Sequence, residues 1–368
     1  MSQKIIILGG GLWGSILAYF FHCQNPDCDF ELYEKNERLG GDHTWSFHST
    51  DIPQNLFSLI KPFISFSWSS QTVKFPLFTR NFSTGYHSIL SSRFHEMMTS
   101  KLPSEKVFLG TNKSPQDFSD ECVVFDCRNL PVDVDGGWQN FYGLDLTLTH
   151  PHGLERPIIM DATVPQLDGY RFVYYLPWDA HRVLIEDTRY SDSKEMNINE
   201  WKMELDHLVE SHGWRIEKVE RIEIGSLPIP FQEFPKANSS RNVLSLGGFS
   251  HEVTGYSIPD CLRLCHLLAA HPEQNLEGWS AILSAYKQDK KWRSLFYRWI
   301  NRFLFLGSPA PMRYKMLQHF YKLPDGVIQR FYAGKTSLPD MVKFFAGKPP
   351  LPLMGIFRVL RDQRSVTL

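Results

Sequence analysis

The first part of the chain shows an apolar run, a glycine-rich turn, a helical pattern and a second, mostly apolar run. Residues 5–8 are all apolar, apolar residues recur through 12–21, and the run 30–33 is followed by Glu34. Short apolar runs on either side of a helical pattern predict two strands joined by a helix. Between the first strand and the helix lies the pattern G-x-G-x-x-G. This order predicts a dinucleotide-binding βαβ unit rather than an arbitrary tight turn.

Each position of the turn has a physical role. The first glycine permits the turn, the second lets the backbone approach a pyrophosphate, and the third lets the helix pack on the strand. The helix N-terminus adds unpaired N–H groups that bind phosphate. The acid that ends the second strand could bind a ribose hydroxyl and disfavours a 2′-phosphate, so we expect FAD or NAD rather than NADP. The candidate cofactor-binding residues here are Gly9, Gly11, Leu12, Trp13, Gly14 and Glu34.

Three later segments favour FAD. Segment 37–47 carries a second glycine pair, 121–129 is typical of a buried strand that ends in an acid, and 241–270 predicts a strand, a glycine turn and a helix. Each could be a plain turn, but a flavin ring and its ribityl chain need close backbone approach, which glycines allow. The further candidates are Gly41, His43, Asp126, Gly247, Gly248, Thr254 and Gly255, with His251 as another contact.

The middle of the chain changes to short alternating strands separated by Gly, Pro and Asp, which predicts an antiparallel sheet. In the segment 182–190, Glu186 and Asp187 are neighbours, so they must point to opposite faces of a strand. Two interpretations remain open from this pattern. Both acids could be strand-end charges paired with Arg171, Arg182 or Arg189. Alternatively, one could be a carboxyl among apolar side chains, whose pKa burial would raise toward that of a proton donor.

Metal binding is not expected. His150 and His152 have a spacing that could hold a metal on a strand, but no third ligand lies nearby, so hydrogen-bonded loop histidines are favoured. The six cysteines show no metal-type spacing and are interpreted as small, reduced, buried apolar residues.

The C-terminal part is helical, aromatic and basic. Residues 279–368 contain 16 Lys plus Arg against 4 Asp plus Glu, whereas the whole chain carries a net charge of −1. The overall charge gives no reason to expect nucleic acid, but the basic end suggests an anionic membrane surface. In 291–307, we expect one apolar helical stripe of Trp292, Leu295, Phe296, Trp299, Phe303 and Leu306, with Arg293, Arg298 and Arg302 on the other side.

These patterns together predict an α/β fold with three parts. No apolar run is long enough to span a bilayer, and the early first strand leaves no room for a signal peptide, so we expect a cytoplasmic protein. The parts are a Rossmann-type FAD-binding domain (1–60, 84–130 and 236–275), an inserted antiparallel-sheet substrate domain (61–83 and 131–235) and a helical, membrane-contacting region (276–368).

Longer motifs carry a specific resemblance. The segments GGDHTWSFH, HPHGLERPIIMDATV, GYRFVYYLP, LIEDTRY, GSLPI, TGYS, NRFLFL, RFYAGK and GKPPLP together resemble the bacterial lycopene β-cyclase family. The resemblance implies a redox-neutral isomerase that closes the ends of lycopene, or a related C40 polyene, into β-ionone rings. It implies reduced FAD with NADPH as electron source. The basic C-terminal helices, apart from the resemblance, predict peripheral attachment to the inner face of the membrane.

The resemblance also assigns roles to residues. The first acid of LIEDT maps to Glu186 as the catalytic carboxyl, with Asp187 a structural residue or a helper through water. The rings of Tyr174, Tyr175 and Trp178 are candidates to stabilise a carbocation. Two other functions remain open: an FAD-dependent monooxygenase or epoxidase, and a polyene-binding flavoprotein without turnover.

Overall fold

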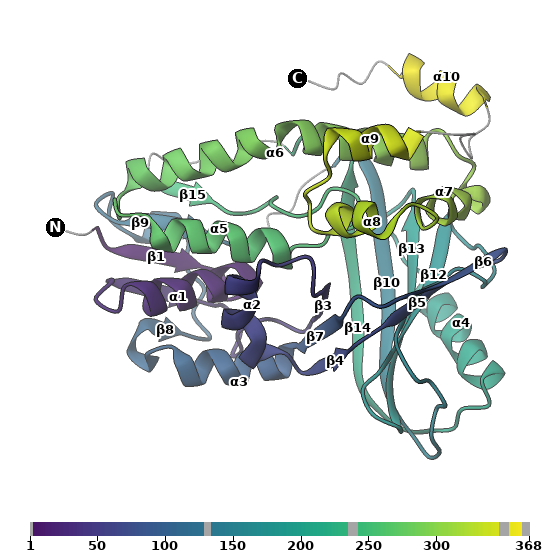
Figure 1. Ribbon diagram of the computed structural model, residues 1–368. Helices are drawn as coiled ribbons and strands as arrows, with labels where there is room; N and C mark the ends of the chain where they lie inside the picture. The colour runs from purple at the N-terminus through teal and green to yellow at the C-terminus, as the bar shows by residue number, and fades with distance from the viewer. Residues whose placement is uncertain (1–2, 129–133, 235–241, 346–352, 363–368) are drawn as a thin grey trace.

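A parallel sheet, built from N-terminal strands and one later strand, forms one half of the protein. The computed structural model describes residues 3–128, 134–234, 242–345 and 353–362 (Figure 1). The strand order is β15-β9-β1-β2-β8, and every pairing is parallel. The strands are β1 (Ile5–Leu8), β2 (Phe30–Tyr33), β8 (Val107–Phe108), β9 (Val123–Asp126) and β15 (Val243–Ser245). Helices α1 (Leu12–Gln24) and α5 (Ile258–Ala270) lie side by side against this sheet, which confirms the Rossmann-type prediction.

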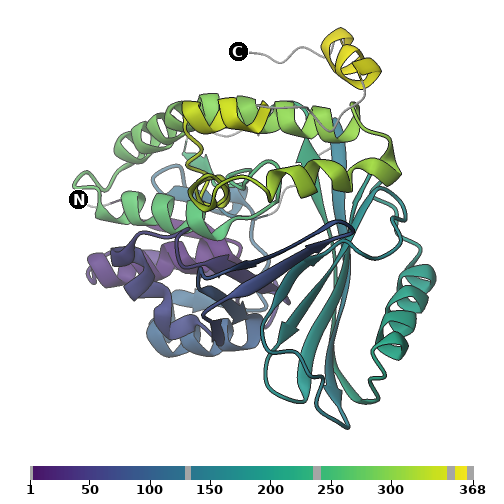
Figure 2. The same ribbon diagram turned by 45° about the vertical axis from the view of Figure 1, so that its right-hand side comes forward.

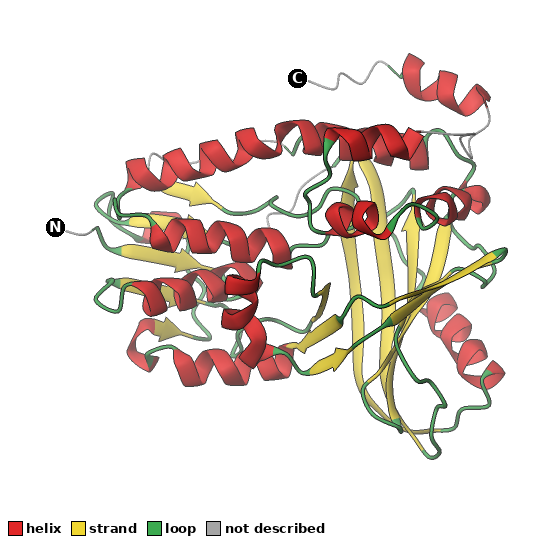
Figure 3. Cartoon of the chain, viewed as in Figure 1, coloured by secondary structure: helices red, strands yellow, loops and turns green. Residues whose placement is uncertain are grey.

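A large twisted sheet forms the other half (Figure 3). Its order is β14-β10-β13-β12-β11-β5-β6. The strands are β5 (Gln71–Phe75), β6 (Phe78–Phe82), β10 (Gly136–Leu148), β11 (Ile158–Asp161), β12 (Tyr170–Pro177), β13 (Arg182–Ser191) and β14 (Ile216–Pro230). The expectation of a purely antiparallel sheet is wrong at one pair, because β11 and β5 run parallel. No hairpin joins these two strands, so the chain does not force them to be antiparallel.

Helix α4 (Ile198–Ser211) covers one face of the large sheet and was not predicted from the sequence. Its buried residues Trp201, Leu205 and Val209 recur every four positions, which is the helical signal that strand-like neighbours obscured. They pack with Val173, Ile185 and the ring of Tyr175. Tyr175 therefore faces α4, away from Glu186, and does not line the same space as Tyr174.

A small three-stranded sheet joins the two halves. It has the order β3-β7-β4, formed by β3 (Thr44–His48), β7 (Tyr86–Leu90) and β4 (Phe66–Trp68). The segment 61–83 is thus divided, since β4 pairs here while β5 and β6 join the large sheet. Helices α2 (Gln54–Ile60) and α3 (Ser91–Lys101) complete the half that contains the parallel sheet.

The C-terminal helices span both halves (Figures 1 and 2). They are α6 (Leu276–Phe305), α7 (Tyr314–Phe320), α8 (Asp325–Tyr332), α9 (Leu338–Phe345) and α10 (Leu353–Arg361). The predicted stripe on α6 is wrong in part: Trp292 is 63% exposed, whereas Arg298 and Arg302 are buried. The buried Arg302 guanidinium has partners: it donates a hydrogen bond to the carbonyl of Asp362 at 3.0 Å and lies over the ring of Trp299.

Aromatic side chains fill the space between the large sheet and these helices. One buried cluster unites residues of the sheet with residues of α6, α7 and α8, including Phe172, Tyr190, Tyr297, Phe320 and Phe331. Another buried cluster joins α1 and α5 to the parallel sheet. Within the described residues, no helix is long and apolar enough to cross a membrane.

The cysteines differ from the expectation of uniform burial. Cys28, Cys261 and Cys265 are buried, Cys122 and Cys127 are half-buried, and Cys23 is exposed.

Candidate functional site

The glycine turn has the geometry that a pyrophosphate requires. Gly9 has a φ of +94°, which favours glycine. A Cβ on Gly14 would lie 2.0 Å from the carbonyl oxygen of Gly9, so only glycine allows α1 to pack there. In contrast, a Cβ on Gly11 would meet no heavy atom within 4 Å. Open space therefore lies before the N-terminus of α1, where a phosphate would bind.

The acid of the second strand is fixed beside this turn. The Glu34 carboxylate accepts hydrogen bonds from the backbone N–H groups of Gly10 at 2.7 Å and Asn36 at 2.9 Å. The two residues that open α1 differ in exposure: Leu12 is buried and Trp13 is half-buried, with its ring 6.1 Å from that of Phe249. These residues fit the adenosine half of FAD.

Two of the later candidates lie next to the glycine turn. The Asp126 carboxylate is paired with Arg128, whose Nη2 lies 2.7 Å from it. The side chain of Arg128 would lie 3.0 Å from a Cβ on Gly9, and its carbonyl oxygen 3.7 Å from a Cβ on Gly247. Asp126 thus positions Arg128 between the two glycine segments.

The remaining glycines adopt conformations that favour glycine. Gly41, Gly248 and Gly255 all have positive φ values. Thr254 and Gly255 belong to a turn in which both backbone N–H groups donate to the carbonyl of His251. The His251 ring is not available for a cofactor, because one nitrogen bonds the Phe331 carbonyl and the other the Val253 N–H. Burial lowers the pKa of His251 to about 4.

Glu186 lies on the aromatic face of the large sheet. In the strand register it stands between Gly143 of β10 and Tyr174 of β12. Its carboxyl accepts a hydrogen bond from Thr188 at 3.0 Å. The side chain keeps some accessible surface although it lies deep within the protein. Burial, and next the negative charge of Glu223, raise the pKa of Glu186 to about 8. The carboxyl is therefore mostly protonated at neutral pH.

Asp187 points to the opposite face and has a different environment. It is fully buried and forms ion pairs with Arg171 at 2.9 Å and Arg189 at 3.0 Å. These arginines are two of the three partners that the sequence suggested; Arg182 instead pairs with Asp145. The position of Asp187 fits a structural role, and nothing places it beside Glu186 on the aromatic face.

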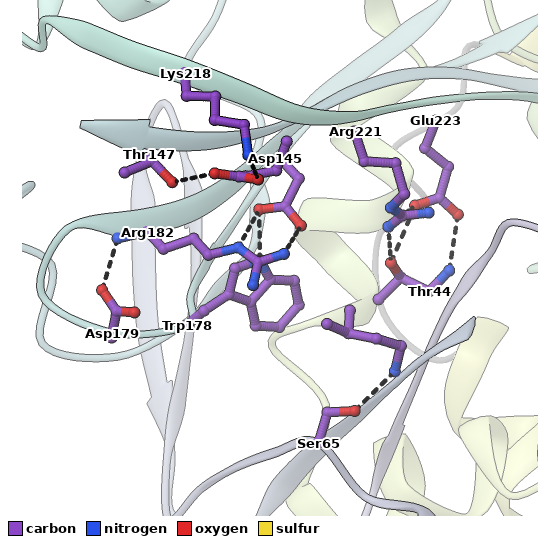
Figure 4. A network of polar contacts seen from close by, with 12 residues as sticks. Thr44, Ser65, Asp145, Thr147, Trp178, Asp179, Arg182, Lys218, Arg221 and Glu223 are labelled. Atoms are coloured by element: carbon purple, nitrogen blue, oxygen red, sulfur yellow. Dashed lines mark hydrogen bonds and ion pairs between the residues drawn. The ribbon is translucent and has the colours of Figure 1, made fainter. Parts of the chain in front are cut away.

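Two functional candidates were not predicted from the sequence. Arg221 and Glu223 of β14 form a polar cluster with Thr44 of the second glycine segment (Figure 4). His43, a predicted cofactor contact, lies 3.7 Å from the Glu223 carboxylate. Strand β14 has an inverted pattern, because Ile222 and Ile224 are about half exposed while Glu223 is 4% exposed. The signal available in the sequence was the alternation of charged and apolar residues along this strand, although it does not show that the charged residues point inward.

His152, one of the two loop histidines, is hydrogen-bonded to the Asp179 carbonyl and the Leu154 N–H. Across the part of the chain that the structure describes, no group of three or more His, Cys, Asp or Glu could hold a metal ion.

Comparison with known proteins identifies relatives over nearly the whole chain. A family described as "Lycopene cyclase protein" matches residues 4–117 and 118–357. A lycopene beta-cyclase of Pseudescherichia vulneris is 35% identical, over 97% of this chain and 96% of the relative. Lycopene beta-cyclases of Pantoea ananas and of a Paracoccus species are 33% and 32% identical over at least 97% of both chains.

Solved structures share the fold at low identity. A geranylgeranyl bacteriochlorophyll reductase-like protein from Thermoplasma acidophilum has a TM-score of 0.64 at 11% identity, over 95% of this chain and 96% of that one. A flavin-dependent brominase has a TM-score of 0.60 at 11% identity, over 94% of this chain and 98% of that one.

Proposed function

The chain belongs to the lycopene cyclase family, and we propose that it closes the linear ends of lycopene, or of a related C40 polyene, into β-ionone rings without net oxidation or reduction. Such an enzyme is an intramolecular lyase of carotenoid synthesis. The observation that carries this proposal is the Glu186 carboxyl, which lies beside aromatic side chains on one face of the large sheet and whose pKa burial raises.

The chemistry needs a proton donor in a dry environment. The Glu186 carboxyl donates its proton to the terminal C=C, and the next double bond attacks the resulting cation to close the ring. A ring carbon then gives up a proton to the carboxylate that the first step produced, which restores the acid and leaves the mass of the polyene unchanged. General acid–base catalysis of this kind contributes roughly 10²–10⁴-fold. Water would quench the cation, so apolar walls are required.

Aromatic rings beside Glu186 can stabilise the cation. Tyr174 is paired with Glu186 in the strand register. The Glu186 carboxylate would also interact electrostatically with the Tyr86 hydroxyl. Burial raises the pKa of Tyr174 well above its ordinary value, so this hydroxyl stays neutral. Trp178 is buried in the same cluster and stacks on Phe66 at 4.7 Å. A cation over such a face gains roughly 2 kcal/mol when water is excluded.

The residues around the glycine turn fit FAD. Gly11 leaves room for the pyrophosphate, and Glu34 stands where a ribose hydroxyl would bind. Bound in reduced form, with NADPH as the electron source, the flavin would supply an electron-rich ring that favours a developing positive charge. Thr44 and His43 of the second glycine segment contact Glu223, so the cofactor region borders strand β14 of the large sheet.

The test measures the rate of ring formation by the Glu186→Gln variant, supplied with prereduced flavin in the absence of oxygen. We expect cyclisation to fall at least about 100-fold while flavin absorbance is retained. Glu220→Gln is the matched control, because Glu220 is an exposed acid on β14 that bonds Thr147 and Lys218. Near wild-type cyclisation by Glu186→Gln would refute the assignment. Product formation that requires oxygen would favour the monooxygenase instead.

The substrate is a membrane-dissolved lipid, and the C-terminal helices fit contact with a membrane surface. On α9, Leu338 and Val342 are each 71% exposed; on α10, Met354 and Leu360 are 76% and 61% exposed. Exposed Lys343, Arg358 and Arg361 accompany them. Apolar side chains flanked by basic ones are typical of helices that lie in a membrane interface. We therefore propose that the protein attaches peripherally to the inner, cytoplasmic face of the membrane.

A further inference from the structure

Glu186 and Glu223 lie in one row across the large sheet. Gly143 of β10 pairs with Glu186 of β13 on one side and with Glu223 of β14 on the other. Side chains at paired positions of neighbouring strands point to the same face. The two acids therefore share a face and are separated only by a residue that has no side chain.

The Glu186 side chain occupies the space that this glycine leaves. A Cβ on Gly143 would lie 3.3 Å from Cβ, Cγ and Oε2 of Glu186. The carboxyl thus leans over Gly143, in the direction of β14. Any larger residue at position 143 would fill the space between the two acids.

Glu223 is held as a carboxylate. It accepts hydrogen bonds from the backbone N–H of Thr44 at 2.8 Å, from the Thr44 hydroxyl at 3.0 Å and from Arg221 at 2.8 Å. Burial alone would raise the pKa of Glu223, but His43, Arg221 and the Thr44 N–H outweigh burial and lower it. Arg221 is in turn anchored to Asp42 at 3.2 Å.

The groups that face Glu186 come from several strands. Glu223 and Arg221 approach from β14, Tyr174 from β12 and Tyr86 from β7. On its own strand, Thr188 donates to it, and Asp187 points to the other face. Both tyrosines are neutral because burial raises their pKa values. Among the described residues, Glu223 is thus the acid whose charge most strongly favours the protonated form of Glu186, and Arg221 is the cation that opposes it.

We propose that Glu223 is a positioning residue for the proton donor: its fixed negative charge, acting across Gly143, keeps the proton on Glu186, and Arg221 acts in the opposite sense. This inference rests on the proposed function for its purpose, but not for its test. The pair resembles other sites in which two carboxyls are driven to opposite protonation states by different surroundings. Because Thr44 and His43 belong to the predicted flavin-binding segment, Glu223 also joins that segment to the acid.

The experiment is a direct titration of Glu186. Glutamate labelled with ¹³C at the side-chain carboxyl is incorporated into the full chain, and the Glu186 resonance is identified by its loss in Glu186→Gln. We expect the titration midpoint to fall by about one pH unit in Glu223→Gln and to rise in Arg221→Gln. Glu220→Gln, which removes an exposed charge from the same strand, should leave the midpoint unchanged.

Activity provides the second measurement. Since Glu186 must be protonated to act, activity is lost as pH rises through its pKa, so the alkaline limb should move down in Glu223→Gln and up in Arg221→Gln. A merely structural role would lower kcat and leave both midpoints in place. An unchanged Glu186 titration in folded Glu223→Gln would overturn the inference. If the titration shifts as expected but Glu186→Gln still forms rings, the proposed function fails and the electrostatic relationship stands.

Discussion

Glu186 and Asp187 are adjacent in sequence, yet one lies among aromatic rings and the other in a buried cluster of arginines. Glu186 and Tyr174 lie on the face of the large sheet that is covered by the C-terminal helices. Asp187, Arg171 and Arg189 lie on the opposite face, which α4 covers. The two acids therefore differ in what their charges do for the folded protein.

Asp187→Asn should destabilise the protein. The Arg171 and Arg189 side chains are at most 1% exposed, so removing the aspartate charge leaves buried positive charge. The expected loss is about 3 kcal/mol, at the lower end of the usual range because Glu204 and Glu200 also pair with these arginines. Urea unfolding followed by tryptophan fluorescence measures it. A loss below about 1 kcal/mol would contradict the structural role of Asp187.

The stability of the wild type should depend on pH through Glu186. Its pKa is about 8 in the folded protein and 4.5 ordinarily, so between these values the unfolded chain releases a proton that the folded protein keeps. The contribution of Glu186 to the free energy of unfolding is thus fully present below pH 4.5. It decreases by at most roughly 1.4 kcal/mol per pH unit as the pH rises, and it stops changing above pH 8. Glu186→Gln should remove this contribution. Parallel slopes for the two proteins over this interval would show that Glu186 ionises normally.

Gly11 and Gly14 should respond differently to alanine. Gly11→Ala places a methyl group in open space, so the protein should fold with an unchanged melting temperature but bind FAD at least about tenfold more weakly. Gly14→Ala directs the methyl group against the Gly9 carbonyl and should lower the melting temperature itself. Flavin fluorescence titration and thermal unfolding separate the two effects. Tight flavin binding by Gly11→Ala would place the pyrophosphate elsewhere.

Membrane binding should depend on α9 and α10. Replacing Val342 and Phe357 with Asp adds charge to two exposed apolar positions, 71% and 56% exposed, and should reduce co-sedimentation with anionic phospholipid vesicles several-fold. The matched control is Leu77→Asp, because Leu77 is 87% exposed in the turn between β5 and β6. Equal binding by the double variant and the wild type would argue against this surface.

Local patterns sufficed for much of the fold and for part of the site. The glycine turn is predictable because strand, turn and helix are consecutive, and the opposite facing of Glu186 and Asp187 follows from strand geometry alone. Strand order is a different matter, since it depends on contacts between distant segments. Nothing local indicates that Gly143 lies between Glu186 and Glu223, because β10, β13 and β14 are far apart in the chain.

The residues that were missed and the expectations that were wrong also have tertiary causes. Strand β14 directs Glu223 inward and its isoleucines outward, because Thr44 and Arg221 supply the polar partners that an inward acid needs. Helical period placed the arginines of α6 opposite the apolar stripe, but Asp362, the last described residue, bonds the buried Arg302. The orientation of Tyr175 depended on α4, which was not expected.

The C-terminal helices are bonded into the rest of the protein at several backbone carbonyls. Asn301 of α6 donates to the carbonyls of Pro230 and Glu252, and Arg313 donates to that of Tyr190. A protein shortened after α5 would lose these donors and expose the rings of the sheet to water. The chain from α6 onward is therefore part of the folded core and not a removable extension, and altering the proposed membrane surface requires substitutions of individual exposed side chains of α9 and α10.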